Sequence, residues 1–216
     1  MAKQQHGYLA DPDEIYRHSF AIVRDTINHE RLDDDITGVA ERLVHATAMP
    51  ALIDDLEWTA GAAAIGRAAL TQGGLILADG QMVVAGITAA RLPAGTEVMC
   101  TLGLGNVPGI ARRLQTTRAA AAVTLWQPWL EGAVVAIGNA PTALFQLLEG
   151  LAAGWPRPAL ILGFPVGFVG AAESKQALAE GDHGVPFVTL KGRLGGSAMA
   201  AAAVNALCGP PPGSGR

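Results

Sequence analysis

The spacing of hydrophobic and polar residues changes about a third of the way along the 216-residue chain. Up to residue 74, apolar residues recur at the spacing of amphipathic helices. At Asp11-Pro12 a capping carboxylate precedes a proline in the first turn, which predicts a helix start. We predict a second helix from Asp35 through His45 that ends before Pro50, and a third over Trp58–Gln72.

From residue 75 onward, short apolar runs alternate with longer helical segments. The five expected strands are Leu75–Asp79, Thr96–Leu102, Ala133–Ile137, Ala159–Leu162 and Pro186–Leu190. The four expected helices are Val107–Gln127, Pro141–Ala153, Val169–Glu180 and Gly196–Leu207. This alternation predicts an α/β fold with a doubly wound, flavodoxin-like, mainly parallel five-stranded sheet, helices on both of its faces and extra N-terminal helices.

The composition agrees with one compact α/β unit. Hydrophobic residues make up 50% of the chain, charged residues 16% and aromatic residues 5%, and 27 residues are glycine. We expect a single domain over residues 1–208 and a disordered tail over residues 209–216, which is rich in proline and glycine. The formal net charge is −4 and the basic residues are scattered, which argues against nucleic acid as a partner.

The ends of the chain and its cysteines predict a soluble, cytoplasmic protein. The first six residues are polar and no apolar signal core follows them. The longest apolar run, Gly195–Gly209, is too short to span a bilayer, so no membrane association is expected. Cys100 and Cys208 lie far apart without metal-like spacing, as in proteins of a reducing compartment.

Three predicted strand-to-helix junctions are rich in glycine. In open α/β sheets ligands bind outside the carboxyl ends of the strands, where N–H groups at helix starts can hold anions. The residues alone leave two interpretations open, an anionic small molecule at this edge or ordinary tight turns. The junctions are Gly138–Thr142, Gly163–Gly170 and Lys191–Ser197.

The motifs of several common chemistries are missing from the sequence. It contains no P-loop, no G-x-S-x-G nucleophile elbow, no Cys-x-x-Cys and no histidine pair at zinc-site spacing. Gly103–Gly109 imitates a dinucleotide fingerprint only loosely. We therefore expect no metal and no cofactor. Of the five histidines, His45 alone lies between apolar neighbours near a helix end, and by position it fits a buried structural histidine better than a catalytic one.

An ordered series of short motifs runs along most of the chain. The most specific are the E-S-K segment and the G-R-x-G-G-S segment. The series spans about residues 14 to 207. Its members are Ile15–Phe20 (Y-x-x-S-F), Arg42–Ala46 (R-x-[IV]-H-A), Asp79–Ile87 (D-x-x-M-V-x-x-G-I), Thr117–Ala121 (T-R-[SA]-A-A), Asn139–Leu144 (N-A-P-T-A-L), Pro165–Lys175 (P-V-G-F-V-x-A-x-E-S-K), Gly192–Ser197 (G-R-x-G-G-S) and Val204–Leu207 (N-A-L). Together these motifs resemble the precorrin-8X methylmutase family of cobalamin biosynthesis. Where that family often has a cysteine before the acid of the third motif, this chain has Ala78, which we expect to leave the chemistry unchanged.

The resemblance implies an isomerase that moves a methyl group from C-11 to C-12 of precorrin-8X, giving hydrogenobyrinate. The shift is intramolecular, so no redox cofactor is required. By resemblance, His45 is the proton donor, and a histidine pKa near working pH suits that role. The other site residues that the resemblance implies bind the substrate, and they are Ser19, Thr88, Arg118, Gly192, Arg193, Gly195 and Ser197.

The resemblance also implies a homodimer with its sites at the interface, a corrinoid substrate and, as further partners, other enzymes of the cobalamin pathway. We expect Glu173 and Lys175 to form a structural pair. Two other interpretations stay open: a corrinoid carrier without activity and the cobalt-precorrin-8 version of the same reaction. A flavodoxin-like domain that binds flavin or nucleotide is a third, but the N-terminal helices and the missing phosphate-loop fingerprint argue against it. The presence of His45 favours an enzyme over a carrier.

Overall fold

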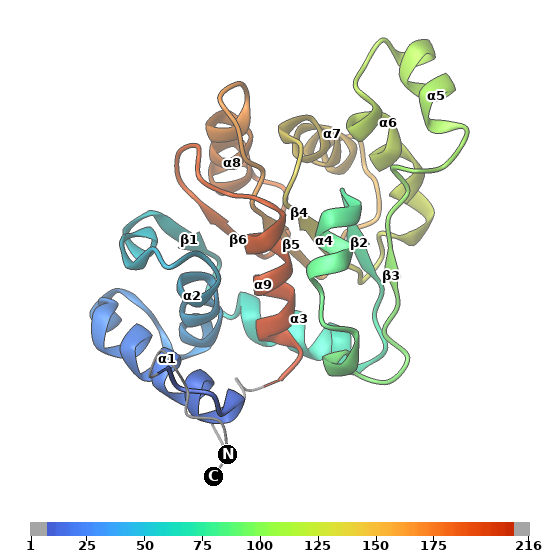
Figure 1. Ribbon diagram of the computed structural model, residues 1–216. Coiled ribbons are helices and arrows are strands. Elements are labelled where there is room, and N and C mark those ends of the chain that lie inside the picture. Colours follow the sequence, from blue (N-terminus) through green and yellow to red (C-terminus); the bar gives the residue numbers. More distant parts are fainter. Residues whose placement is uncertain (1–7, 210–216) are drawn as a thin grey trace.

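The computed structural model describes residues 8–209, which form a six-stranded sheet with helices packed on both faces (Figure 1). The strands are β1 (Leu56–Trp58), β2 (Ile76–Ala78), β3 (Val98–Met99), β4 (Val134–Ile137), β5 (Leu160–Gly163) and β6 (Phe187–Leu190). The α-helices are α1 (Pro12–Thr26), α2 (Asp34–Thr47), α3 (Ala62–Thr71), α4 (Gln81–Gly86), α5 (Val107–Leu114), α6 (Arg118–Val123), α7 (Pro141–Ala152), α8 (Ala171–Glu180) and α9 (Ser197–Leu207). The 3₁₀ turns are η1 (His29–Arg31), η2 (Pro50–Asp55), η3 (Ala89–Arg91) and η4 (Thr124–Trp129).

The strand order across the sheet is β1-β6-β5-β4-β2-β3. All neighbouring strands are parallel except β1, which pairs antiparallel with β6. Counted along the chain, the five parallel strands lie in the order 2-1-3-4-5, which is the flavodoxin-like arrangement. The predicted fold class is therefore confirmed, and the five predicted strands are all present.

Alternate residues of each strand enter two different cores. Val134 and Ala136 pack with α2, α3 and α9 on one face, whereas Val135 and Ile137 pack with α7 and α8 on the other. Figure 1 shows the same two layers, with α7 and α8 on one side of the sheet and α2, α3 and α9 on the other. The strands are apolar throughout because both faces are covered.

Small residues let α9 lie close to its neighbours. An added Cβ at Gly86 of α4 would come within 2.7 Å of Ala201, and one at Gly138, after β4, within 2.7 Å of Ala200. The alanine-rich composition therefore reflects close packing of helices on this face of the sheet. This packing places α2 beside α9 and leaves the far side of α2 for α1.

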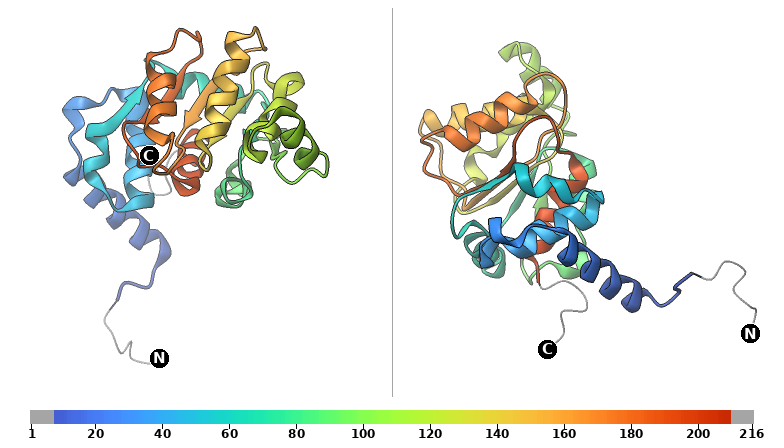
Figure 2. Two further views of the ribbon diagram at one scale, coloured as in Figure 1. Left: turned by 90° about the horizontal axis from the view of Figure 1, so that it is seen from above. Right: turned by 90° about the vertical axis from the view of Figure 1, so that its left-hand side faces the viewer.

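The first two helices are fixed by side-chain caps. Asp11 and Asp33 cap α1 and α2 by accepting hydrogen bonds from the third residue that follows each of them. Figure 2 (right) shows α1 extending away from the sheet, so only part of the helix packs against the body of the protein. Phe20 and Val23 are the buried residues of α1.

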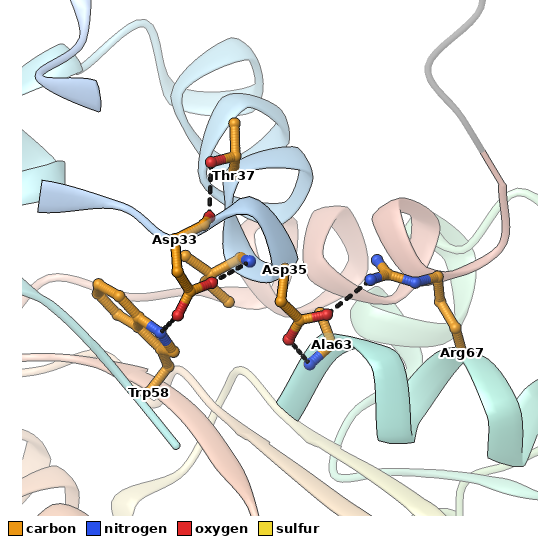
Figure 3. A network of polar contacts seen from close by, with 7 residues as sticks. Asp33, Asp35, Thr37, Trp58, Ala63 and Arg67 are labelled. Carbon is orange, nitrogen blue, oxygen red and sulfur yellow. Dashed lines mark hydrogen bonds and ion pairs between the residues drawn. The ribbon is translucent and has the colours of Figure 1, made fainter. Parts of the chain in front are cut away.

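A polar network anchors the start of α2 to the sheet and to α3 (Figure 3). The second carboxylate oxygen of Asp33 accepts from the indole N–H of Trp58, 2.9 Å away, and this bond is the main reason why the pKa of Asp33 is lowered. Asp35 accepts from the backbone N–H of Ala63 at 2.9 Å and pairs with Arg67 at 2.7 Å. The network sets the position of α2, the helix that carries His45.

Three predictions about the elements were wrong. Leu56–Trp58 forms an additional edge strand, so the sheet has six strands rather than five, and α3 begins after Gly61, at φ +77°, rather than at Trp58. The expected helix over Val107–Gln127 is broken at Gln115, which has φ +52°, and a new helix starts after Thr117. Helix α4 was not predicted.

Within residues 8–209, no helix combines the length and the hydrophobicity needed to cross a membrane. The extent of the domain stays a prediction, and all but the first residue of the expected tail over 209–216 lies outside the described residues.

Candidate active site

His45 and Ser19 come from different helices and meet in a hydrogen bond. Ser19 lies in the middle of α1, and His45 lies in the last turn of α2. The Ser19 hydroxyl is 2.9 Å from Nδ1 of His45, and it is the only hydrogen-bond partner of the ring among the described residues. A hydroxyl can donate to a bare Nδ1 or accept from a protonated one, so Ser19 can hold the ring in either state while Nε2 exchanges a proton.

Aromatic rings hold the His45 imidazole in place. Phe20 stacks on it with ring centroids 4.6 Å apart and an interplanar angle of 23°, and Tyr16 lies tilted at 5.5 Å. Arg42, one turn before His45 on α2, donates to the Tyr16 hydroxyl. Its guanidinium carbon is 5.7 Å from the ring centroids of both Tyr16 and Phe20. The imidazole of His45 and the guanidinium of Arg42 thus leave the same face of α2, and both lie against the rings of Tyr16 and Phe20.

The surroundings of His45 favour its neutral form. Burial lowers the pKa of the imidazole below 6.5, and the positive charge of Arg42 lowers the pKa further. Without ligand, the site therefore holds a histidine that loses its proton below the pH at which a free imidazole does.

A cavity of about 280 Å³ opens beside the imidazole. The cavity is lined by residues of α1, of the end of α2 and of the start of η2, and most of these residues are apolar. Ligand pockets in proteins commonly occupy about 300–1,000 Å³, so this cavity can enclose only part of a tetrapyrrole. The lining residues are Ser19, Ile22, Val23, Thr26, Val44, His45, Ala48 and Pro50.

One of the three glycine-rich junctions has its N–H groups already occupied by the protein. Asp79, which follows β2 and is 3% exposed, accepts from the N–H groups of Gly138, Asn139 and Ala140 at 2.8–3.0 Å. This is the point between β2 and β4 at which the strand order reverses. Burial raises the pKa of Asp79 and these hydrogen bonds oppose the rise. The loop after β4 is thus organised by an internal carboxylate.

The other predicted binding residues lie around the sheet edge and on α4–η3. Arg118 is exposed at the start of α6, next to the cap Thr117, whose hydroxyl is 2.8 Å from that of Thr142 at the start of α7. Arg193 is exposed and lies 5.7 Å from the ring centroid of Phe168. The Thr88 N–H donates to Asn205 of α9.

The glycine-rich segment after β6 has structural reasons for its glycines. An added Cβ at Gly195 would lie 2.4 Å from the carbonyl oxygens of both Phe164 and Pro165. Gly192 has φ +70° and lines a second cavity of about 690 Å³ between β1, β6 and α8, and Ser197 starts α9. Of the predicted site residues, only Ser19 and His45 share a hydrogen bond. The catalytic and substrate-binding roles of all these residues stay predictions.

The expected pair between Glu173 and Lys175 does not form. Glu173 is exposed, whereas Lys175 is 1% exposed and its ammonium donates to the Leu194 carbonyl. Burial lowers the pKa of Lys175 to about 8. Lys175 therefore ties α8 to the loop after β6.

The sequence did not predict four residues that the structure places at the His45 site or at the loop after β4. Tyr16 and Arg42 belong to motifs quoted for the family resemblance, but helical spacing alone could have placed Arg42 on the face of His45. Phe20 and Asp79 also belong to motifs of this series, and apart from its motif Phe20 carried only the signal of an apolar helix position. Asp79 was visible as an acid at the end of a strand, but its partners lie about 60 residues further along the chain.

Comparisons with known proteins agree with this fold. The family model described as precorrin-8X methylmutase matches residues 14–209. The precorrin-8X methylmutase of Pseudomonas aeruginosa is 56% identical over 93% of this chain and 96% of its own length. That of a Sinorhizobium species is 51% identical over 95% of this chain and 98% of its own.

A more distant relative and a solved structure extend the comparison. The cobalt-precorrin-8 methylmutase of Priestia megaterium is 36% identical over 91% of this chain and 87% of its own length. The crystal structure of precorrin-8X methylmutase from Thermus thermophilus superposes with a TM-score of 0.80 at 37% identity, over 90% of this chain and 95% of that one. The chain belongs to the precorrin-8X methylmutase family.

Proposed function

We propose that this protein is the isomerase that moves a methyl group from C-11 to C-12 of precorrin-8X and so forms hydrogenobyrinate in cobalamin biosynthesis. The observation that carries the proposal is the Ser19–His45 pair, partly buried against stacked rings and open to a cavity, in a chain of this family. The surroundings of His45 lower its pKa, and perturbed pKa values are common in groups used in proton transfer.

In the proposed reaction the methyl group migrates within the substrate, and the protein handles only a proton. His45 donates that proton, or a hydrogen bond, to the conjugated system beside the migrating methyl group and makes it more electron-poor. Ser19 holds Nδ1 so that Nε2 faces the substrate, and the Phe20 ring keeps the imidazole plane fixed. Arg118 and Arg193 are exposed cations suited to the substrate's peripheral carboxylates.

The similarity to known proteins supports the metal-free substrate. Two relatives above 50% identity are named precorrin-8X methylmutases, whereas six relatives named cobalt-precorrin-8 methylmutases are 29–37% identical. The cobalt-containing substrate is the alternative, and it requires the same residues. A carrier without activity is the other alternative, and the geometry of the His45 site favours the enzyme over it.

The size of the cavity supports a homodimer with shared sites. About 280 Å³ is too little room for a tetrapyrrole with its side chains, so the site needs further walls. A second copy of the chain can supply them, as the family resemblance implies. A cytoplasmic location and contacts with other cobalamin-pathway enzymes stay predictions from the sequence.

The decisive experiment is incubation of the protein with precorrin-8X while the visible spectrum is recorded. Because the methyl shift extends conjugation, we expect the absorption of a corrin to appear, and a parallel incubation with cobalt-precorrin-8 compares the two substrates. The His45→Ala variant should lose turnover and keep most of its affinity for the product, because the ring acts in the chemical step.

His18→Ala is the matched control for that variant. His18 lies on α1 next to Ser19, but its side chain is exposed, so this variant should turn over at the wild-type rate. An intact wild-type protein that leaves both spectra unchanged would contradict the enzyme function. Normal turnover by His45→Ala would contradict the assignment of His45 alone.

A further inference from the structure

A buried lysine holds the loop between β6 and α9. Lys175 of α8 is 1% exposed, and its ammonium donates to the carbonyl of Leu194 in this loop. None of the three ion pairs found among residues 8–209 includes Lys175. Burying a cation against one neutral carbonyl has a desolvation cost that a single hydrogen bond does not offset. Stability alone therefore explains this lysine poorly, and a role in function explains it better.

The loop has few other polar connections to the protein. The N–H of its first residue, Lys191, donates to the Asp55 carbonyl at 2.8 Å, and the N–H of Gly196 donates to a carbonyl that follows β5 at 2.8 Å. Between these two points, the bond from Lys175 is the one hydrogen bond to residues 192–195 that is found within the described part of the chain. Lys175 is therefore the main polar tie that fixes these residues.

The segment that Lys175 fixes carries the exposed cation Arg193. The guanidinium carbon of Arg193 lies 5.7 Å from the ring centroid of Phe168, and this ring is 86% exposed. A guanidinium that rests on a ring is held in one plane, which suits bidentate binding of a carboxylate. Leu194, whose carbonyl accepts from Lys175, is the next residue, so the bond fixes the backbone directly after the arginine.

The loop begins close to the cavity beside His45. Pro50, the first residue of η2, lines that cavity, and Asp55, the last residue of η2, accepts from Lys191 of the loop. A 3₁₀ helix rises about 2.0 Å per residue, so the six residues of η2 span about 12 Å. A tetrapyrrole with its carboxylate side chains can bridge this distance. Arg193 can therefore reach a carboxylate of a macrocycle that lies against His45.

We propose that Lys175 is a positioning residue for substrate binding, which fixes the loop of residues 191–196 so that Arg193 can hold a side-chain carboxylate of the substrate. The inference rests on the proposed function, because it takes the ligand to be a tetrapyrrole that carries carboxylates. It adds a role for the buried lysine of the E-S-K segment, and this role requires no contact between Lys175 and the substrate.

The charge of Lys175 gives this role a pH dependence. Burial lowers the pKa of the ammonium to about 8, and Asp55 of η2 opposes the fall. The other charged groups around it are Glu57, Glu180 and Lys191, which line the cavity of about 690 Å³ beside Lys175. Below about pH 8 a charged donor holds the loop, and above that pH the hydrogen bond loses its charge assistance. Affinity for the substrate should therefore fall as the pH rises from about 7 to about 9.

The first test compares ligand affinity with stability. Lys175→Met removes the charge and the hydrogen bond but keeps an unbranched side chain in the same space. We expect it to bind hydrogenobyrinate about 10-fold more weakly in an absorption titration, as loss of a charge-assisted hydrogen bond predicts. With precorrin-8X the loss should appear in KM and not in kcat, because His45 is untouched. The midpoint of denaturant unfolding should not fall, because a desolvated charge is removed.

Glu173→Gln is the matched control for that variant. Glu173 is an exposed residue of α8, two positions before Lys175. This variant should bind hydrogenobyrinate and turn over precorrin-8X as the wild-type protein does.

A double substitution separates positioning from a general structural role. Arg193→Gln alone should weaken the binding of hydrogenobyrinate about 10-fold, because it removes the cation that holds the carboxylate. In that background Lys175→Met should weaken binding by less than about twofold, because the arginine that Lys175 positions is already absent. Two independent structural effects would instead multiply.

Lys175→Arg tests the role of the charge. The cavity beside Lys175 leaves room for a guanidinium, which stays protonated throughout the accessible pH range. We expect Lys175→Arg to bind hydrogenobyrinate nearly as well as the wild-type protein at about pH 7, and to keep that affinity at about pH 9, where the wild-type protein binds more weakly.

Three outcomes would overturn the inference while leaving the enzyme function intact. The first is wild-type affinity of Lys175→Met, and the second is an equal loss from Lys175→Met with and without Arg193. The third is the same fall in affinity with pH in Lys175→Arg as in the wild-type protein, and this comparison decides if Lys175→Met fails to fold. Failure of the proposed function looks different, because the wild-type protein would then leave precorrin-8X unchanged while the titrations with hydrogenobyrinate still report the role of Lys175.

Discussion

At the scale of single residues, the chemistry of the site depends on how His45 is surrounded. Ser19 is hydrogen-bonded to one ring nitrogen, and burial together with the charge of Arg42 lowers the imidazole pKa. An acid with a lowered pKa gives up its proton more readily once it is protonated, but it is protonated less often in the free protein. A role as acid therefore requires that the pKa of His45 rise when a substrate that carries carboxylates is bound.

The pH dependence of the reaction should report this surrounding. The free protein has the active acid form below the pKa of His45 and loses it above, so kcat/KM should fall as the pH rises through a value below 6.5. The fall in kcat, which reports the pKa of His45 in the enzyme–substrate complex, should occur at a higher pH than the fall in kcat/KM. Initial rates measured from about pH 5 to pH 8 check both limbs. A kcat/KM that instead rises over this range would show that His45 acts as a base.

At the scale of elements, internal carboxylates hold the helices that carry site residues. Asp33 and Asp35 fix the start of α2. Asp79 fixes the start of α7, where Thr142 meets Thr117, the cap of the helix that begins with Arg118. The position of Arg118 therefore depends on a carboxylate that follows a different strand.

Asp79 should be important for stability. Asp79→Ala removes an acceptor from three N–H groups at 2.8–3.0 Å in a buried place, and we expect a loss of about 2–4 kcal/mol in the free energy of unfolding. Asp54→Ala is the control, because Asp54 is exposed, and it should change stability by less than about 0.5 kcal/mol. Denaturant unfolding compares the two variants, and equal midpoints would contradict the structural role of Asp79.

At the scale of the whole molecule, helix α1 packs mainly against one other element of its own chain, helix α2. It extends from the body in Figure 2, and it contributes Ser19 to the site. Ile15 is 45% exposed and Ile22 is 66% exposed on this helix. Apolar side chains exposed on a projecting helix are well suited to packing against a second copy, which would also enlarge the small cavity beside His45.

A charge on this helix should weaken the proposed homodimer. Ile15→Glu places a carboxylate on the exposed apolar face of α1 without touching the cavity wall. We expect the mass in solution, measured by light scattering after size exclusion, to shift from twice the chain mass toward 22.2 kDa, with turnover reduced in parallel. Arg17→Glu, an exposed charged position on the same helix, is the control. A wild-type protein that is monomeric at assay concentration would contradict the dimer.

The sequence by itself determined the parallel sheet, most of its helices and the family. Apolar runs such as Ala159–Leu162 predict buried strands whatever their neighbours are, because both faces of a parallel sheet exclude water. The edge strand Leu56–Trp58 could not be predicted, because three residues carry too short a pattern and their pairing with β6 joins segments more than 120 residues apart.

Only the tertiary structure decided how the site is built. The sequence could name His45 and Ser19 through a family resemblance, but not their hydrogen bond, which joins residues 26 apart. It left the anion-binding role of the three loops open, and the structure showed that Asp79 occupies one of them. The electrostatics of His45 likewise depend on burial and on Arg42 resting over two rings of another helix. Such effects fall off within a few ångströms, so they are set by which side chains the fold brings together.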